Sequence, residues 1–493
     1  MFVQSMHIAG LWPSRRRLHE AIMAKWWKVG ILLLATTLLP GQLRAQFKLF
    51  AKKTKDDPPP AFSNGPEQKD PQFCPDPRDV PAGGPAFCPT PEGPPQTPFL
   101  PCNEEDRNAF CDWHRPERSL CFWAKAEYLN WWMRDASVGS ILATTSRTPN
   151  LANNFGALGQ SGTEILFGPG EYDLGHLQGG RLTAGFTLPF FFPVEVSGFW
   201  LDKKNDLFSA RSDGGPNSLL IARPVFLTQL HQQGAFNAGF PAGLAANIAV
   251  AGSFAIKTST NLWGIDPSVF FHVGSSDVLS VDFFLGYKYA ELREYWQFLG
   301  TDTALLGTFL PFNGGAVGPG GTTAAFDQFS TLNRFNGGQI GMRTGLSLWQ
   351  FNLSADTKLA MGPTSQRVDV QGNSSATTTL TPLTVSNFAP GGILALPSNI
   401  GRTGGNRFSI IPELDLNLGV QITRQFRLFA GYDIMYWSSV VRPSDQLNNN
   451  IDSRQAPTDV AFAPGFRGTQ PPSSFHRTDF WAQGFSVGFL FGW

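Results

Sequence analysis

Apolar and polar residues alternate with a period of two in four stretches of this chain. From Phe408 to Ile422 most even positions are apolar, whereas Ser, Glu, Asp, Asn and Gln occupy most odd positions. Residues 351–361, 279–288 and 339–347 show the same separation, with their charged side chains on one face. This period predicts β-strands with one apolar and one polar face. Six less regular segments bring the predicted strands to ten: 122–132, 177–188, 194–201, 261–273, 426–437 and 480–493.

The connections between these strands alternate in length. Short links are predicted at 189–193, 274–278, 349–350 and 423–425, and long links rich in Gly, Pro, Asn and Ser at 133–176, 202–260, 289–338, 362–407 and 438–479. Outer-membrane barrels have short periplasmic turns and longer outer loops, so this order predicts a barrel with both ends of its sheet in the periplasm. A soluble sandwich has no reason to sort its connections in this way, although long loops also occur as insertions in globular domains.

We therefore predict that residues 120–493 form an all-β body, an antiparallel transmembrane up-and-down β-barrel of about 10–12 strands. The higher number includes a further hairpin made by Leu219 to Leu227 and Asn247 to Ile256. Pro267 and Pro412 lie inside two predicted strands. Because proline lacks a ladder donor, we expect each of them near a strand end or a bulge.

Composition favours a surface that faces lipid. Aromatic residues make up 13% of the 493 residues and charged residues only 15%, with 43 Phe and 14 Trp. This balance suits contact with a membrane better than contact with water. The net charge is zero and no cluster of Lys and Arg stands out in the body. We therefore expect outer-membrane lipid as a partner and no nucleic acid, because a basic stripe that could neutralise phosphates is missing from the sequence.

Residues 1–45 are expected to form the signal region. Two lysines precede an apolar stretch from Val29 to Leu39 that is too short to cross a bilayer, and the chain is expected to be cleaved after Ala45. The residues before Met23 have no place in such a signal, so Met23 is the expected start, with an unusually long charged region as the alternative. No other apolar run approaches the roughly 18 residues of a membrane helix, so membrane residence must come from strands.

Residues 46–119 are expected to form a mostly disordered periplasmic linker. Prolines crowd the stretch from Pro58 to Pro101, which prevents a packed core and favours a semi-stiff tether. Export makes disulfides the expected state of the cysteines, and their odd number leaves one free or paired with another chain. Zinc binding is the alternative, but there is no Cys-x-x-Cys pair and only His114 lies nearby. The five cysteines are Cys74, Cys88, Cys102, Cys111 and Cys121.

The last strand ends in alternating aromatic residues. Phe489, Phe491 and Trp493 follow Phe485 and Val487, with Ser and Gly on the other face. This pattern is similar to the C-terminal signal of outer-membrane barrels, in which the last residue is usually Phe rather than Trp. We therefore expect the barrel-assembly machinery to bind this strand, although a buried last strand of a soluble sheet is the alternative.

Five segments of the body resemble the putative beta barrel porin-7 family of outer-membrane proteins. They are 126–132 (AEYLNWW), 179–185 (GGRLTAG), 333–341 (NRFNGGQIG), 391–401 (GGILALPSNIG) and 431–443 (GYDIMYWSSVVRP). The resemblance covers most of residues 120–493 and excludes the Pro- and Cys-rich linker. It implies a barrel in the outer membrane, and it carries no demonstrated substrate.

No group of residues predicts catalysis. Asp266, Ser268 and His272 share one face of a predicted strand, but Ser268 and His272 lie about 13 Å apart at strand rise, too far for proton transfer. The other histidines form no close pair or HExxH motif. The Gly-rich segment 314–321 lacks the Lys-Ser or Lys-Thr of a phosphate-binding loop. We therefore expect no enzyme activity, no metal and no cofactor.

The polar face of the strands is expected to line the barrel interior. Structural ion pairs are the simplest role for these mixed charges, and a selectivity filter is the alternative. Ten to twelve strands leave a bore far narrower than the roughly 16 to 18 strands of water-filled porins. We therefore predict a narrow, porin-like passive channel for small solutes in a bacterial-type outer membrane, with a structural or surface-display barrel whose long loops bind partners as the alternative. The candidate lumen-lining residues are Lys125, Glu127, Arg181, Glu195, Asp282, Lys288, Arg343, Asp356, Lys358, Glu413, Asp415, Arg427 and Asp433.

Overall fold

The computed structural model describes residues 121–146, 155–172, 175–187, 192–245, 247–305, 307–380 and 383–493. The predicted signal region and linker lie outside these residues, and so do four of the five cysteines. Among the described residues, no helix is long and apolar enough to cross a membrane.

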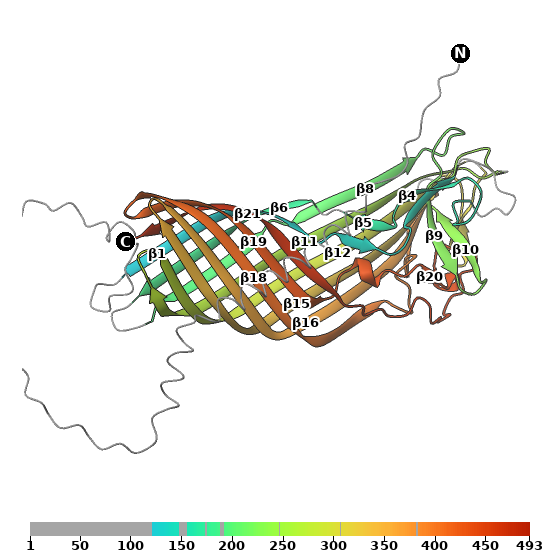
Figure 1. Cartoon of the computed structure of the whole chain (residues 1–493). Helices are drawn as coiled ribbons and strands as arrows, with labels where there is room; N and C mark the ends of the chain where they lie inside the picture. The colour runs from blue at the N-terminus through green and yellow to red at the C-terminus, as the bar shows by residue number, and fades with distance from the viewer. Residues whose placement is uncertain are drawn as a thin grey trace, which may run out of the picture. The chain divides into compact units, whose positions relative to one another are not determined.

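Ten antiparallel strands close into a ring in the described part of the chain (Figure 1). Neighbours in the ring follow the order of the chain, and β21 closes it by pairing with β1 over Trp123 to Met133. The ten segments predicted from the alternation are all strands of this ring. Their bounds are β1 (Cys121–Met133), β6 (His176–Thr187), β7 (Val194–Leu201), β11 (Val250–Ser275), β12 (Leu279–Ala304), β15 (Thr322–Leu348), β16 (Phe351–Leu380), β18 (Gly401–Thr423), β19 (Phe426–Val440) and β21 (Thr478–Gly492).

The two ends of the ring differ. The short links after β11, β15 and β18 lie at one end together with the C-terminus, and the described parts of the long connections lie at the other (Figure 1). We call these the turn end and the loop end. The sorting agrees with the predicted alternation of short and long connections.

Several strands run far past the length that a membrane requires. Strands β11 and β12 have 26 residues each, β15 has 27 and β16 has 30, against about 9–11 needed to cross a bilayer. The predicted loops 202–260, 289–338 and 362–407 are therefore wrong over much of their length. The outward face of β12 changes from apolar to polar after Tyr289. We call the part of the barrel from Arg293 onward, together with the adjacent parts of the other long strands, the loop-end half. The rest of the ring is the turn-end half.

The predicted extra hairpin is wrong. Residues 222–227 form β9, which pairs with β10 (Gln232–Asn237) in a separate small sheet, and residues 250–256 are the start of β11. The strand beside that start is β8 (Lys204–Ser212), which continues along β11 where β7 stops. The ring therefore keeps ten strands.

Both prolines lie inside strands rather than at ends or bulges, which corrects that expectation. Pro267 lies in β11 between the pairs Ile265–Tyr289 and Ser268–Gly286, which share one register, so the ladder to β12 is interrupted without a shift. Pro412 pairs with β16, and the ladder from β18 to β19 begins only at the next residue. In each case the missing donor is accommodated by a gap in one ladder.

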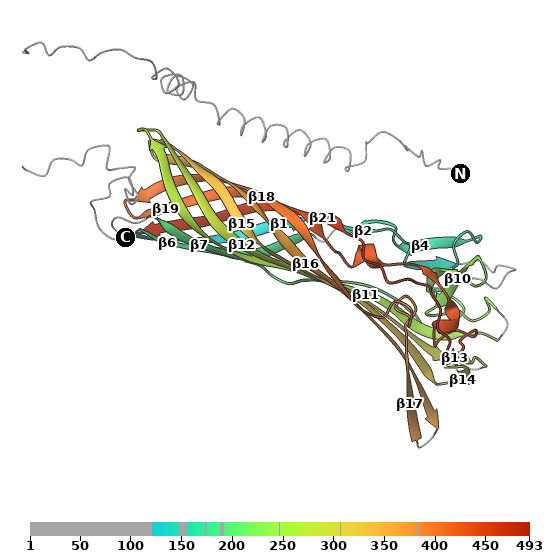
Figure 2. The same cartoon turned by 90° about the horizontal axis from the view of Figure 1, so that it is seen from below.

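The loop-end half has an apolar core of its own. Phe254, Trp296, Phe298 and Phe329 point inward from the long strands and are at most 2% exposed, and Ile393–Leu396 and Val441 pack on them. Small elements surround this core, and β17 projects from the ring (Figure 2). They are β2 (Ala136–Val138), β3 (Ala143–Ser146), β4 (Thr163–Phe167), β5 (Gly170–Tyr172), β13 (Leu310–Phe312), β14 (Gly315–Val317), β17 (Leu383–Pro390), β20 (Asn450–Ile451) and the 3-10 helices η2 (Ser444–Gln446) and η3 (Ser453–Gln455).

The outside of the turn-end half is an apolar band. Leu285, Leu416, Val487 and Phe489 are 44%, 39%, 58% and 45% exposed, although each lies within a fully paired strand. Polar neighbours such as Asn417 and Ser486 point inward and are buried. This arrangement, apolar outside and polar inside, is that of a barrel built for lipid.

Candidate functional site in the barrel interior

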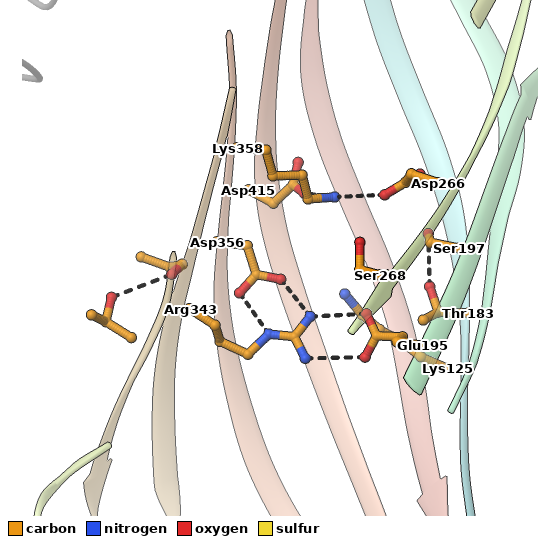
Figure 3. Close-up of polar contacts among 12 residues, drawn as sticks. Lys125, Thr183, Glu195, Ser197, Asp266, Ser268, Arg343, Asp356, Lys358 and Asp415 are labelled. Carbon is orange, nitrogen blue, oxygen red and sulfur yellow. Dashed lines mark hydrogen bonds and ion pairs between the residues drawn. The ribbon is translucent and has the colours of Figure 1, made fainter. Parts of the chain in front are cut away.

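Arg343 on β15 crosses the interior between two carboxylates (Figure 3). Its Nε and Nη2 donate to Asp356 Oδ1 and Oδ2 at 2.9 and 2.8 Å, and its Nη1 and Nη2 donate to Glu195 Oε2 and Oε1 at 3.0 Å each. Asp356 is the cross-strand neighbour on β16, but Glu195 lies on β7, which does not pair with β15. Trp123 also donates to Glu195 at 3.2 Å. One guanidinium therefore joins two strands that are separated in the ring by β11 and β12.

Asp415 connects two further cations. Lys358 Nζ lies 3.4 Å from Asp266 Oδ2 and 3.1 Å from Asp415 Oδ2 (Figure 3). Arg181 lies 3.7 Å from Asp415 through Nη2 and 3.2 Å from Asp433 through Nη1. Asp415 and Asp433 are direct cross-strand partners, so the alternation itself places two carboxylates side by side between two cations.

The remaining charges also pair inside the ring. Lys288 Nζ lies 2.6 Å from Glu413 Oε1, and these side chains are only 1% and 8% exposed. Lys125 Nζ lies 3.1 Å from Glu127 Oε1. We call this set the charged layer; it contains eight carboxylates and five cationic side chains. Its members are Lys125, Glu127, Arg181, Glu195, Asp266, Asp282, Lys288, Arg343, Asp356, Lys358, Glu413, Asp415 and Asp433.

The structure places the thirteen candidate lumen-lining residues on inward-facing positions and brings twelve of them into the charged layer. Arg427 lies apart at the turn end, where it donates to Gln421 and Asn352 at 2.8 and 3.1 Å. Asp266 belongs to the layer but was not among the candidates. Its position in the alternation of β11 could have identified it, because it shares a face with Ser268 and His272.

Asp266, Ser268 and His272 do not act together. Asp266 faces Lys358, Ser268 accepts from Gln339 at 3.4 Å, and His272 Nδ1 lies 2.9 Å from Asp282 Oδ1. Each of the three has a different partner on another strand. The geometry therefore contains no proton relay among them.

An apolar layer follows the charged layer toward the loop end. Most inward positions that follow in that direction are apolar or glycine, although Ser197 on β7 and Gln339 on β15 are polar. Trp437 and Phe335 meet edge to face in this layer, with 6.1 Å between ring centroids. Trp437 is fully buried and donates to Thr364 at 2.9 Å. The apolar layer consists of Leu129, Trp131, Met133, Leu177, Phe199, Leu201, Leu262, Ala290, Leu292, Phe335, Ala360, Ile411, Met435, Trp437, Val440, Phe480 and Ala482.

Little space remains where the two layers meet. Trp131, Phe199 and Met435 border this space from the apolar side, and Arg181 and Lys288 from the charged side. The space has room for about one water molecule. At this level the inward side chains are buried and fill the bore.

Sequence reasoning missed the buried polar contacts of the loop-end half. Asp327 Oδ1 accepts from the backbone N–H groups of residues 393–395 at 2.8, 2.9 and 2.7 Å, and its Oδ2 lies 2.8 Å from Arg223. Arg442 pairs with Glu294 at 2.8 Å, and both are 3% exposed. These residues lay in predicted loops, where an isolated charge gives no sign of its partner.

Two sets of buried contacts in this half involve segments that carry the family resemblance. The turn held by Asp327 is the start of 391–401. Asn333, the first residue of 333–341, donates to the Val441 carbonyl at 2.8 Å and accepts from the Val441 N–H at 2.7 Å, which ties it to the end of 431–443. The Asn333–Val441 contacts therefore join 333–341 to 431–443, and Asp327 fixes 391–401 to strand β15.

The aromatic residues of the predicted assembly signal lie on the outside of the closing strand. Phe489, Phe491 and Trp493 are 45%, 40% and 57% exposed. Trp493 stacks on Phe122 of β1 at 5.9 Å between ring centroids. The predicted signal thus lies at the seam where the ring closes.

Comparisons with known proteins place the chain in a family. Solved structures similar to this chain include the outer membrane protease OmpT from Escherichia coli (8% identity, 77% of this chain and 100% of that chain, TM-score 0.32), a Pseudomonas aeruginosa FadL homologue (7%, 76% and 90%, 0.18) and the P. putida toluene transporter TodX (8%, 76% and 89%, 0.17). These TM-scores are too low to bear on activity. No curated protein matches the chain. The family model described as putative beta barrel porin-7 matches residues 123–493, and the chain belongs to this family of outer-membrane β-barrels.

Proposed function

We propose that this protein is a closed outer-membrane barrel that anchors and positions its loop-end half at the cell surface. The observation that carries the proposal is the filling of the bore by three successive sets of side chains. They are the charged layer, the apolar layer and the core of the loop-end half. A solute would have to displace members of all three sets.

The energetic cost of opening supports a closed state. Removing one partner of a buried ion pair costs about 3–5 kcal/mol, because the other charge loses its compensation. Arg343 alone holds two carboxylates through four hydrogen bonds. The apolar layer adds close packing around Trp437 and Phe335, which a hydrated solute cannot enter without losing water.

A narrow passive channel for small solutes is the second candidate. The charged layer favours it, since apolar side chains of similar volume would fill a purely structural barrel at a lower desolvation cost. Its eight carboxylates and five cationic side chains would give such a channel a modest preference for cations. The family description as a porin is consistent with this candidate.

Planar-bilayer recordings of the purified full chain separate the two candidates. A closed anchor gives no current, and alanine replacements at Arg181, Arg343 and Glu413 leave it silent because the apolar layer remains. A channel gives a small conductance, and Glu413→Gln lowers its cation preference. Arg427→Ala, at the turn end and outside the charged layer, is the matched control. A steady cation-selective current in the unmodified protein would overturn the anchor proposal.

We further propose that the chain has lipid as a partner, binds no nucleic acid and has no enzyme activity. We also propose that its C-terminal strand binds the barrel-assembly machinery. Support for the assembly role comes from the exposed alternation that ends at Trp493. Trp493→Ala should reduce the amount of folded protein in outer-membrane fractions, whereas Trp349→Ala, at an 85% exposed turn residue, should not. Equal yields of the two variants would remove this role.

A further inference from the structure

Three arginines stand close together on the outer surface of neighbouring strands. In the register of the sheet, Arg293 of β12 pairs with Leu332 of β15, and Leu332 pairs with Arg367 of β16. Arg334 lies two residues from Leu332 on the same face of β15. Neighbouring strands are about 4.8 Å apart, so the three side chains start within about 10 Å of one another. We call Arg293, Arg334 and Arg367 the arginine triangle.

The side chains of the triangle are accessible, and the leucine between them is covered. Arg293 and Arg334 side chains are 58% and 47% exposed, and Arg367 is also exposed. Leu332 is only 8% exposed, although its position in β15 faces outward. Long arginine stems commonly cover apolar surface while their charged ends stay in water. Arg293 and Arg334 both pair with Glu291, which brings their guanidinium groups together beside the covered Leu332.

The triangle has more positive than negative charge. Glu291 is the one carboxylate that pairs with it among the described residues; it lies 3.0 Å from Arg293 Nη2 and 2.8 Å from Arg334 Nε. Arg367 makes no ion pair with a described residue. One carboxylate and three guanidinium groups leave an excess of two positive charges, which a phosphate monoester can balance and a phosphodiester reduces to one.

The height of the triangle on the barrel identifies its ligand. Along β12 the outward residues of the apolar band are Phe283, Leu285, Tyr287 and Tyr289. The next two outward residues toward the loop end are Glu291 and Arg293. Tyr289 donates to Glu291 at 3.1 Å, so the aromatic edge of the band touches the charged cluster. Aromatic residues mark the membrane–water boundary of such barrels. A group bound here would lie level with lipid headgroups.

We propose that the arginine triangle binds the phosphate of an anionic lipid headgroup in the outer leaflet. Guanidinium groups bind phosphate oxygens through paired, charge-assisted hydrogen bonds, and basic groups near a membrane surface attract anionic lipids. The acyl chains of the same lipid would lie on Leu285, Tyr287 and their neighbours in the apolar band. The proposal requires the outer-membrane location and does not depend on whether the bore conducts.

Native mass spectrometry of the full chain in neutral detergent tests this site. Phosphatidylglycerol is added as the anionic probe and phosphatidylcholine as the zwitterionic one. The unmodified protein should retain phosphatidylglycerol preferentially. The variant R293Q/R334Q/R367Q should lose the preference by about fivefold per arginine, on the order of 100-fold in all. The matched control R211Q/K257Q/R467Q removes three exposed cations farther toward the loop end and should keep the preference.

Three outcomes would overturn the proposal. The first is an unchanged lipid preference in R293Q/R334Q/R367Q, and the second is an equal loss in the control variant. The third is full displacement of the lipid by inorganic phosphate at equal concentration, which would assign the triangle to free phosphate. Resistance to unfolding in detergent is measured for each variant. The conservative variant R334K should retain most of the preference, so that a folding defect and a loss of binding can be told apart.

Discussion

The two halves of strand β12 differ in which face is apolar. In the turn-end half, Phe283 and Leu285 point outward, and Asp282 and Lys288 point inward. In the loop-end half, Trp296 and Phe298 point inward, and the outward positions include Arg293, Tyr295 and Gln297. The backbone ladder continues through both halves without a change of register to β15.

This reversal shows that the surrounding medium, rather than the strand, decides the pattern. A barrel wall in lipid must present apolar side chains outward, so its polar side chains collect inside and must pair there. A strand in water reverses the requirement, and its apolar side chains form the inner core. We therefore infer that the membrane ends between Tyr289 and Arg293.

The largest effect should come from removing a charge inside the turn-end half. Arg343→Met keeps an unbranched side chain but leaves Glu195 and Asp356 without their cation, which should destabilise the barrel by about 3–5 kcal/mol. Phe298→Met in the apolar interior of the loop-end half should cost less than about 1.5 kcal/mol. Unfolding from lipid vesicles by urea measures both. Adding Glu195→Gln and Asp356→Asn to Arg343→Met should restore most of the loss, and a failure of this rescue would show that packing rather than charge is responsible.

A charge placed on the outside separates the two media directly. Leu285 and Leu299 are outward-facing residues of β12 and each is 44% exposed. Leu285→Arg should cost about 2–4 kcal/mol because it lies in the apolar band, whereas an arginine on a water-exposed strand is worth less than about 0.5 kcal/mol. The same unfolding measurement on Leu299→Arg provides the control. Equal losses in the two variants would mean that lipid does not end between these positions.

The turn-end half could be predicted from the sequence because its alternation is strong and has a single sense. Charged residues such as Asp415, Arg343 and Lys358 alternate with apolar residues that face lipid. This alternation predicts both the strands and the side of each strand that faces the lumen. The loop-end half was predicted as loops because the sense of the alternation reverses within one strand. If the whole strand is expected to keep one apolar face, residues such as Glu294 and Trp296 do not fit that expectation.

The contacts of the site could not be predicted in the same way. A cross-strand pair such as Arg343 with Asp356 follows from the register of β15 and β16. The short turn at 349–350 fixes that register, so the pair could be predicted from the sequence. Arg343 also pairs with Glu195 across the bore, and this depends on how the whole ring closes. The turn that binds Asp327 likewise joins residues far apart in the chain, so only the resemblance marked its importance.

The loop-end half should lose stability as the pH rises, through Asp302. Its Oδ1 is buried without a hydrogen-bond partner, and burial raises the pKa of this carboxyl to about 8, although Arg223 and the N–H of Gly239 act in the opposite sense. In the unfolded chain an Asp titrates at about pH 4. The stability that the neutral, buried Asp302 carboxyl contributes is therefore complete below about pH 4 and is lost as the pH rises to about 8. Between pH 6 and 8 the expected loss is about 2 kcal/mol.

Hydrogen exchange of β9 and β10 at pH 6 and pH 8, corrected for the intrinsic rate, measures this loss. Asp302→Asn should remove the dependence, because the amide stays neutral at both values. Asp213→Asn, at an exposed position of the same half, should keep it. Equal protection of the unmodified protein at the two pH values would contradict the buried state of Asp302.

The smallest effect should come from an ion pair that faces water. Arg402 Nη2 lies 3.0 Å from Asp369 Oδ2 on the outside of the loop-end half, a distance close to that of the Arg343 pairs, but the Arg402 side chain is 64% exposed. Water and salt screen such a pair, so Arg402→Gln should change the free energy of unfolding by less than about 1 kcal/mol, and still less at high salt. The chemistry of this pair matches that of Arg343, and its medium is different. A loss as large as that of Arg343→Met would mean that the number of hydrogen bonds, rather than burial, sets the energy of ion pairs in this barrel.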